Sequence, residues 1–180
     1  GRFVRIMRLV GTLLPCVVIL GMAGCCRRAE MPEPPPPENK VVTDLPLGII
    51  GETEVVYLPD FTVPFEARID TGATTSSIDA RDVRTFERDG RKWVSFRVFA
   101  RSGGESKEYE LPVARTVRIK QHGGESLERI SVMLTFRMGH LTLEREFTLT
   151  DRSKFEYPVL VGRNIINGIA AVDPSRRNVL

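Results

Sequence analysis

The sequence lacks cysteine over most of its length. Its three cysteines are Cys16, Cys25 and Cys26, and no residue from Arg27 to Leu180 is a cysteine. This absence excludes disulfides, thiol catalysis and cysteine-bound zinc from that part of the chain. We therefore expect its stability to come from a hydrophobic core.

Histidine is also scarce, and the two histidines are poorly placed for metal binding. His122 lies in a glycine-rich stretch and His140 at a predicted hairpin turn, with no HExxH motif and no pair at ligand spacing. A glycine-rich phosphate loop ending in Lys-Ser or Lys-Thr is absent as well. We predict no metal site, no ATP site and no cofactor.

The surplus of positive charge is confined to the first residues. The net charge is +3, and Arg2, Arg5 and Arg8 account for all of it, so residues 25–180 carry a net charge of 0. Trp93 and the phenylalanines alternate with polar residues without a basic surround, which is typical of core positions. The sequence therefore predicts no nucleic-acid partner.

No apolar run is long enough to be a permanent membrane span. The uncharged residues 9–24 cover about 24 Å as a helix, against roughly 30 Å for a bilayer core. The run ends in small residues before Cys25, a pattern that resembles a bacterial lipoprotein signal. We expect residues 1–24 to be a signal peptide, Cys25 to carry the lipid anchor, and the protein to face the periplasm. Cys26 and Arg27 favour the outer membrane, and a cleaved secretion signal or an uncleaved anchor is the alternative.

A proline-rich stretch precedes a domain with strand periodicity. Residues 25–47 include Pro32 and the prolines at 34–37, with few apolar residues, so we expect an extended linker. From residue 48 to 180, apolar and polar residues alternate in runs that are separated by turn residues. This pattern predicts an all-β barrel or sandwich with one short helix at residues 163–168.

Two short motifs follow apolar strands. Asp70 begins Asp-Thr-Gly-Ala after the predicted strand at residues 65–69, and Gly162 begins Gly-Arg-Asn after a second strand. The first motif alone is a common turn composition. In this order the two resemble the retropepsin-like aspartic proteases. Residues 67–77 and 147–163 are similar to a bacterial family often labelled ATP-dependent zinc protease, which in some genomes accompanies ATP-grasp glutamate ligases.

The resemblance implies a closed retropepsin-like barrel that hydrolyses peptide bonds at Asp70. Such chemistry needs two carboxylates about 3 Å apart that share one proton. Because the chain has a single Asp-Thr-Gly, we predict a homodimer in which Asp70 meets its counterpart from a second copy. The resemblance also assigns active-site support to Thr71, Gly72 and Ala73, a flap to His122, Gly123 and Gly124, and a structural motif to Gly162, Arg163 and Asn164.

The sequence departs from the compact viral enzymes at two places. Thr74 stands where those enzymes carry an acid that pairs with the arginine of Gly-Arg-Asn. Asp79 and Asp82 are the candidates to replace that acid as the partner of Arg163. Residues 91–111 are extra hairpins, which we expect to gate or cover the cleft.

Three functions follow from these patterns. The first is a lipid-anchored aspartic endopeptidase that acts as a homodimer on a peptide or protein. The second is a non-catalytic binding or assembly module of the cell envelope, in which the Asp-Thr-Gly turn is structural. The third, suggested by the family's genomic company, is hydrolysis of a glutamate-containing or peptidoglycan-like peptide.

Overall fold

The computed structural model describes residues 44–120 and 126–180. The predicted signal peptide, Cys25 and most of the linker lie outside these residues, as do the flap candidates His122, Gly123 and Gly124. The described residues form strands and one short helix, in the order β1 (Gly48–Ile50), β2 (Thr53–Tyr57), β3 (Phe65–Ile69), β4 (Ser76–Arg88), β5 (Arg91–Phe99), β6 (Ser106–Pro112), β7 (Arg115–Lys120), β8 (Ser126–Met138), β9 (Leu141–Thr150), β10 (Val159–Val161), α1 (Arg163–Ile166) and β11 (Ala170–Val172).

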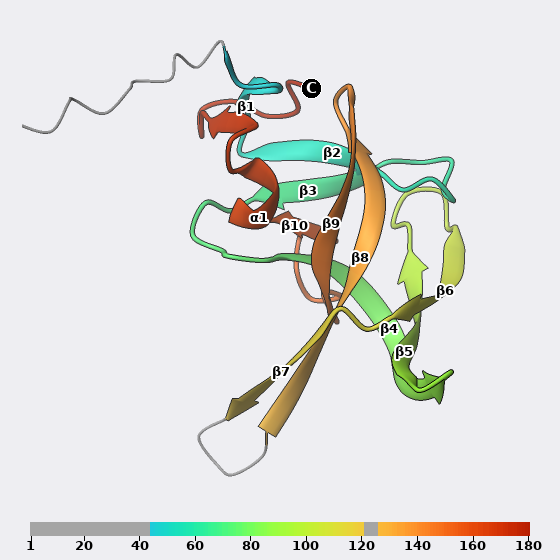
Figure 1. Ribbon diagram of the computed structural model, residues 1–180. Helices are drawn as coiled ribbons and strands as arrows, with labels where there is room; N and C mark the ends of the chain where they lie inside the picture. Colours follow the sequence, from blue (N-terminus) through green and yellow to red (C-terminus); the bar gives the residue numbers. More distant parts are fainter. Residues whose placement is uncertain (1–43, 121–125) are drawn as a thin grey trace, which may run out of the picture. The chain divides into compact units, whose positions relative to one another are not determined.

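Six of the strands form a closed barrel (Figure 1), which confirms the predicted all-β fold. Around the barrel the order is β10, β3, β2, β8, β9 and β4, and β4 pairs with β10 to close the ring. β10 is parallel to β3, and β9 is parallel to β4. Because β10 lies between β3 and β4, the residues that follow β10 meet the loop that joins those two strands.

Alternating apolar residues fill the barrel. Phe65 and Ile69 of β3 are buried, whereas Glu66 between them is exposed. Phe136 of β8 and Phe147 of β9 meet edge to face with their ring centres 5.3 Å apart. Complete burial of one such side chain contributes about 1.5–3 kcal/mol. The strand periodicity read from the sequence therefore corresponds to the core.

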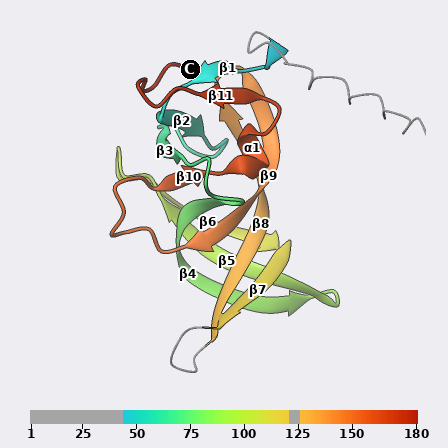
Figure 2. The ribbon, with the colours of Figure 1, turned by 90° about the vertical axis from the view of Figure 1, so that its left-hand side faces the viewer.

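Two hairpins extend from the end of the barrel opposite β1 and β11 (Figures 1 and 2). One consists of β7 and β8. In the other, β4 continues past the barrel to pair with β5, and β5 pairs with β6. The extra hairpins expected at residues 91–111 are thus β5 and β6. None of their residues lines the groove described below. That they gate or cover the cleft stays a prediction.

Trp93 requires a second correction. Val94 and Phe96 of β5 are buried against the barrel side, but Trp93 lies on the opposite face and is half-buried. The Arg88 guanidinium lies 4.7 Å from the centre of the Trp93 ring and 5.1 Å from that of Phe86. Since successive side chains of a strand face opposite ways, Trp93 belongs to the solvent side. It is a surface residue covered by an arginine and not the core residue that we expected.

The helix α1 is shorter than the predicted residues 163–168. It ends at Ile166 because Asn167 has a non-helical backbone (φ −58°, ψ 120°), and Gly168 follows with a φ of 76°. Glycine adopts such a positive φ readily, so the chain turns back there. β11 then pairs in parallel with β1. Within residues 44–120 and 126–180, no helix has the length and apolarity needed to cross a membrane.

Candidate active site

The Asp-Thr-Gly turn lies where β3 ends, beside β10. The backbone N–H of Asp70 donates to the Val161 carbonyl at 2.9 Å. The Asp70 carboxylate Oδ1 accepts the amides of Gly72 at 2.9 Å and Ala73 at 3.2 Å. A Cβ at Gly72 would lie only 3.1 Å from that oxygen. The turn therefore fixes one carboxylate oxygen, and Oδ2 has no hydrogen-bond partner among the described residues.

Arg163 holds the same turn from the first position of α1. Its Nη1 donates to the carbonyl oxygens of Thr71 at 3.0 Å and Gly72 at 2.8 Å. Its Nη2 donates to Oγ1 of Thr74 at 2.9 Å. The threonine that stands in place of the expected acid thus supplies an acceptor itself.

Neither acid proposed as the partner of Arg163 takes that role. Asp79 is buried, and its Oδ2 lies 3.6 Å from Nη2 of Arg101. Asp82 is exposed, and its Oδ2 lies 3.6 Å from Nη1 of Arg97. The expectation that Asp79 or Asp82 replaces the missing acid is therefore corrected, because a hydroxyl and two carbonyls satisfy Arg163 within its own chain.

Gly162 and Asn164 hold the far end of the turn through Ser76. Oδ1 of Asn164 accepts the Ser76 amide at 2.9 Å and the Ser76 hydroxyl at 2.7 Å, and Nδ2 donates to the Glu146 carbonyl at 2.8 Å. The Ser76 hydroxyl oxygen accepts the Gly162 amide at 2.9 Å. A Cβ at Gly162 would approach the Ala73 carbonyl oxygen to 2.9 Å, so the contact needs glycine. The two sequence motifs form one hydrogen-bonded unit.

A hollow of about 510 Å³ lies beside the turn and is lined in part by Asp70, Thr71 and Glu52. Nη2 of Arg177 and Nη1 of Arg68 contact the Glu52 carboxylate at 2.6 and 2.8 Å. The hydrogen bond from Arg177, followed by the contacts of Arg68, holds the pKa of Glu52 below its ordinary value. Both carboxylate oxygens of Glu52 are engaged by arginines, Oε1 by Arg177 and Oε2 by Arg68. Glu52 is therefore unsuited to be the second carboxylate of a dyad within one chain.

A second hollow, an open groove of about 560 Å³, begins at Ala73 and Thr74 of the same turn. Three arginines line it: Arg115 of β7, Arg129 of β8 and Arg152, which follows β9. Among the described residues, no aspartate or glutamate lines the groove. The β7–β8 hairpin, whose connecting residues include the flap candidates, forms one wall.

These arginines lie on three separate segments, and only the fold brings them together. Arg115 is paired with Glu146 at 2.9 Å. Arg152 is 7% exposed and belongs to residues 147–163, which carry the similarity to the bacterial family. That similarity is the one sequence signal for Arg152, and it does not indicate which side chain of the segment reaches the groove. Arg115 and Arg129 carry no such signal.

The described residues contain no group of three or more His, Cys, Asp or Glu side chains placed to hold a metal ion. His140 is exposed at the turn between β8 and β9, and His122 lies outside the described residues. The chemistry available around Asp70 in these residues is that of carboxylate, backbone amide and guanidinium groups. We derive no step through zinc from them.

A closed six-stranded barrel that carries an Asp-Thr-Gly turn against a Gly-Arg-Asn strand end defines a retropepsin-like protein. The RimB-like family model, described as retropepsin-like aspartic endopeptidase RimB, matches residues 49–180. The chain therefore belongs to the RimB-like family. The predicted retropepsin-like resemblance is confirmed, whereas the label of ATP-dependent zinc protease stays a prediction.

Curated relatives are named for a different activity. A protein of Shewanella pealeana named probable alpha-L-glutamate ligase is 37% identical over 130 residues, which cover 71% of this chain and 28% of that protein. A Desulfotalea psychrophila protein of the same name is 32% identical over 135 residues, covering 73% and 29%. The chain thus spans less than a third of the length of these relatives.

A solved structure has a similar fold. The crystal structure of a Legionella pneumophila protein of unknown function is similar with a TM-score of 0.62 and 30% sequence identity. The match covers 73% of this chain and 96% of that one. The barrel described here therefore corresponds to nearly the whole of that protein.

Proposed function

We propose that this chain is an aspartic endopeptidase whose active site forms when two copies meet at Asp70. One observation carries the proposal: Oδ1 of Asp70 is fixed by the amides of Gly72 and Ala73 at 2.9 and 3.2 Å, while Oδ2 is left to face a second carboxylate. Membership of a family described as aspartic endopeptidases supports it.

The chemistry follows from the proximity of the two carboxylates. At about 3 Å both cannot be ionised, so the pair shares one proton. The ionised member takes a proton from a water molecule as that water attacks the peptide carbonyl carbon, and the protonated member gives its proton to the carbonyl oxygen. The tetrahedral intermediate then collapses: the peptide nitrogen takes the proton that the first carboxyl gained from water, the second carboxylate takes a proton back from a hydroxyl of the intermediate, and the C–N bond breaks. The amides of Gly72 and Ala73 keep each carboxylate oriented throughout.

A second copy is needed because one chain supplies half of this site. The sequence has one Asp-Thr-Gly, and the neighbouring acid Glu52 is paired with Arg177 and Arg68. A two-fold axis through the turns would bring Asp70 against its counterpart. The two carboxyls would then titrate as a coupled pair.

The groove supports a substrate that carries acidic side chains. Arg115, Arg129 and Arg152 line it without an acid among the described lining residues. Relatives of this chain are named probable alpha-L-glutamate ligase, and the product of such a ligase would contain glutamate. We therefore propose a glutamate-containing peptide as the substrate class.

The place of action is a proposal from residues outside the described ranges. The signal that ends at Cys25 supports lipid attachment there, and the proline-rich residues 25–47 support a spacer between membrane and domain. The enzyme would then act at the periplasmic face of the membrane.

The test is cleavage of a mixed peptide library by the full chain between about pH 4 and 7, where carboxyl pairs operate. Asp70→Asn should lower the rate by about a thousandfold or more. Asp89→Asn is the matched control, because Asp89 lies exposed at the β4–β5 turn with a φ of 53° that asparagine tolerates. EDTA should leave the rate unchanged.

Solution mass measured over a range of protein concentrations completes the test. Activity should rise with the dimer fraction. Cleavage that survives Asp70→Asn would assign the activity to other residues. A strict monomer without cleavage would favour the alternative, a binding or assembly module of the envelope.

A further inference from the structure

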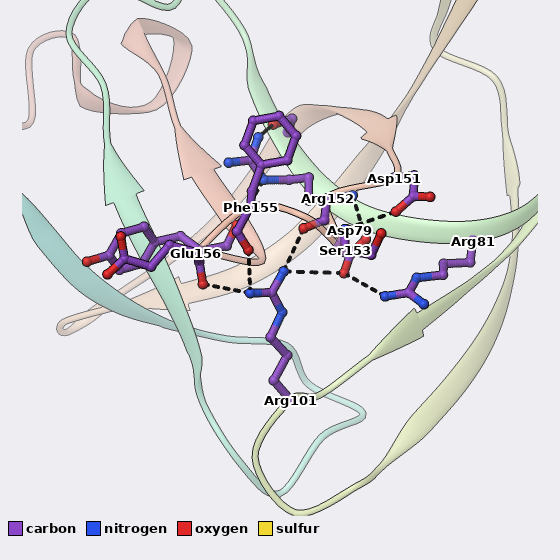
Figure 3. Close-up of polar contacts among 10 residues, drawn as sticks. Asp79, Arg81, Arg101, Asp151, Arg152, Ser153, Phe155 and Glu156 are labelled. Carbon is purple, nitrogen blue, oxygen red and sulfur yellow. Dashed lines mark hydrogen bonds and ion pairs between the residues drawn. The ribbon is translucent and has the colours of Figure 1, made fainter.

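Three segments that are distant in the sequence meet at one wall of the groove (Figure 3). They are Asp79 on β4, Arg101 in the turn between β5 and β6, and the loop of residues 151–157, which we call the groove loop. Arg152 of this loop lines the groove. These contacts are separate from the hydrogen bonds that hold the Asp70 turn, so they need a separate explanation.

Arg101 binds the groove loop from behind. Its Nη1 donates to the carbonyl oxygens of Phe155 at 2.7 Å and Glu156 at 2.6 Å, and its Nη2 donates to that of Arg152 at 2.7 Å. Figure 3 shows the guanidinium between these carbonyls and Asp79. The rigid fork of an arginine can donate to several acceptors at once, whereas lysine offers one compact ammonium group. Arg101 thereby fixes the backbone of the loop without lining the groove itself.

Asp79 fixes the loop from the barrel side. It is 2% exposed, and its Oδ1 accepts the backbone N–H of Arg152 at 2.7 Å. Its Oδ2 lies 3.5 Å from Arg81 and 3.6 Å from Arg101. A buried carboxylate needs such partners, because an unpaired buried charge is costly. The main chain at Arg152 is thus held on both sides.

The Arg152 side chain is held too, but incompletely. Its Nε donates to the Tyr157 carbonyl at 3.0 Å and its Nη1 to the Ser77 hydroxyl at 3.1 Å. The Phe155 ring covers the guanidinium at 4.6 Å. Burial lowers the pKa of Arg152 and Asp79 opposes that shift. The group stays cationic because an arginine side chain is not deprotonated in proteins. No residue in the described ranges accepts a hydrogen bond from Nη2.

We infer that Arg152 is a specificity-determining residue that binds a carboxylate side chain of the substrate through its open Nη2 edge, and that Arg101 is the residue that positions it. Arg115 is less suited, because Glu146 already pairs with it. This inference rests on the proposed function for its substrate. It adds that Arg152 recognises the acid and that Arg101 sets that recognition.

The experiment measures binding in the full chain with Asp70→Asn, so that no peptide is cut. The probes are a peptide of alternating glutamate and alanine and its glutamine counterpart. We expect the glutamate peptide to bind about tenfold or more tightly, since a charge-assisted hydrogen bond discriminates by that amount. Arg152→Gln should bring the ratio of the two dissociation constants close to one.

Positioning by Arg101 gives a distinct pattern. Arg101→Ala should lower the glutamate-to-glutamine ratio although Arg101 does not line the groove, and Arg101→Lys should restore part of it. Arg97→Ala is the matched control, because Arg97 of the same hairpin pairs only with Asp82 and Glu108 among the described acids. That variant should keep the ratio. Thermal unfolding of each variant shows whether it is folded. If Arg101→Ala does not fold, the Arg101→Lys and Arg152→Gln variants test the inference in its place.

Two outcomes would overturn the inference. One is a ratio that Arg152→Gln leaves unchanged, or that is near one from the start. The other is an Arg101→Ala variant that weakens both peptides equally, which would mean a purely structural role. Neither of these two binding results depends on cleavage. A failure of the Asp70 cleavage test would therefore refute the proposed function without deciding the inference about Arg152.

Discussion

Removing the Asn164 side chain would break the link between the two active-site motifs. Asn164→Ala deletes an acceptor for the Ser76 amide and hydroxyl and a donor to the Glu146 carbonyl. Ser76 is fully buried, so its amide would lose its partner without access to bulk water. Three net hydrogen bonds of about 1 kcal/mol each predict a loss of about 3 kcal/mol in the free energy of unfolding.

Urea unfolding at fixed protein concentration, followed by circular dichroism, measures this loss. With a slope of about 2 kcal/mol per molar urea for a domain of this size, the midpoint should fall by about 1.5 M. The slope itself should stay unchanged. Asn167→Ala is the matched control, because Asn167 is exposed just beyond the same helix, and it should change the stability by less than about 0.5 kcal/mol.

A double-mutant cycle separates this link from general damage. Ser76→Ala removes the hydroxyl that donates to Asn164, so the two losses share this hydrogen bond and should be less than additive by about 1 kcal/mol. Additive losses would refute the reasoning, because they would mean that Asn164 and Ser76 stabilise the fold independently. A change at Asn164 no larger than that of the control would refute it as well.

Two further predictions concern packing and pH. Gly162→Ala would place a methyl group 2.9 Å from the Ala73 carbonyl oxygen and 3.0 Å from the Thr75 carbonyl carbon, both backbone atoms, so we expect a loss of about 1–3 kcal/mol in calorimetric stability. An unchanged melting temperature would show that the turn can yield. For Glu52, the hydrogen bond from Arg177 lowers the folded-state pKa from 4.5, so the carboxylate contributes stability above that pH and loses it as the pH falls through the lower folded-state value. The melting temperatures of wild type and Glu52→Gln should therefore differ near neutral pH and converge as the pH falls through the folded-state pKa of Glu52, and parallel curves would contradict this linkage.

Much of the barrel could be predicted because strand alternation is a local property. Phe65 and Ile69 signal a buried face without knowledge of any partner strand. Asp70 and Gly162 could be singled out because each follows such a strand directly. Alternation does not show which face of a strand is buried by other residues where that strand extends beyond the barrel. Trp93 was misplaced for this reason, since β5 packs its Val94 face inward.

The groove could not be predicted because its contacts join residues that are far apart in the chain. Arg101 and the Arg152 carbonyl are 51 positions apart, and Asp79 and the Arg152 amide are 73 apart. Contacts between charged residues at such sequence separations produce no periodic pattern in the sequence, and Arg101 is indistinguishable there from an ordinary turn residue. The pairing of β4 with β5, β9 and β10 brings them together.

Two separate sets of hydrogen bonds hold Asp70, the proposed catalytic residue, and Arg152, the proposed substrate-binding residue. Asp70 is held by the residues that follow β10, through Arg163 and Asn164, whereas Arg152 is held by Asp79 and by Arg101 of the β5–β6 hairpin. By the resemblance to the compact viral enzymes, that hairpin is an addition to the basic fold. Its Arg101 contacts the back of the groove loop, and none of its described residues donates to or accepts from the Asp70 turn. Because each support has its own hydrogen bonds, substrate recognition could change through residues 101 and 152 while the geometry of Asp70 stayed the same.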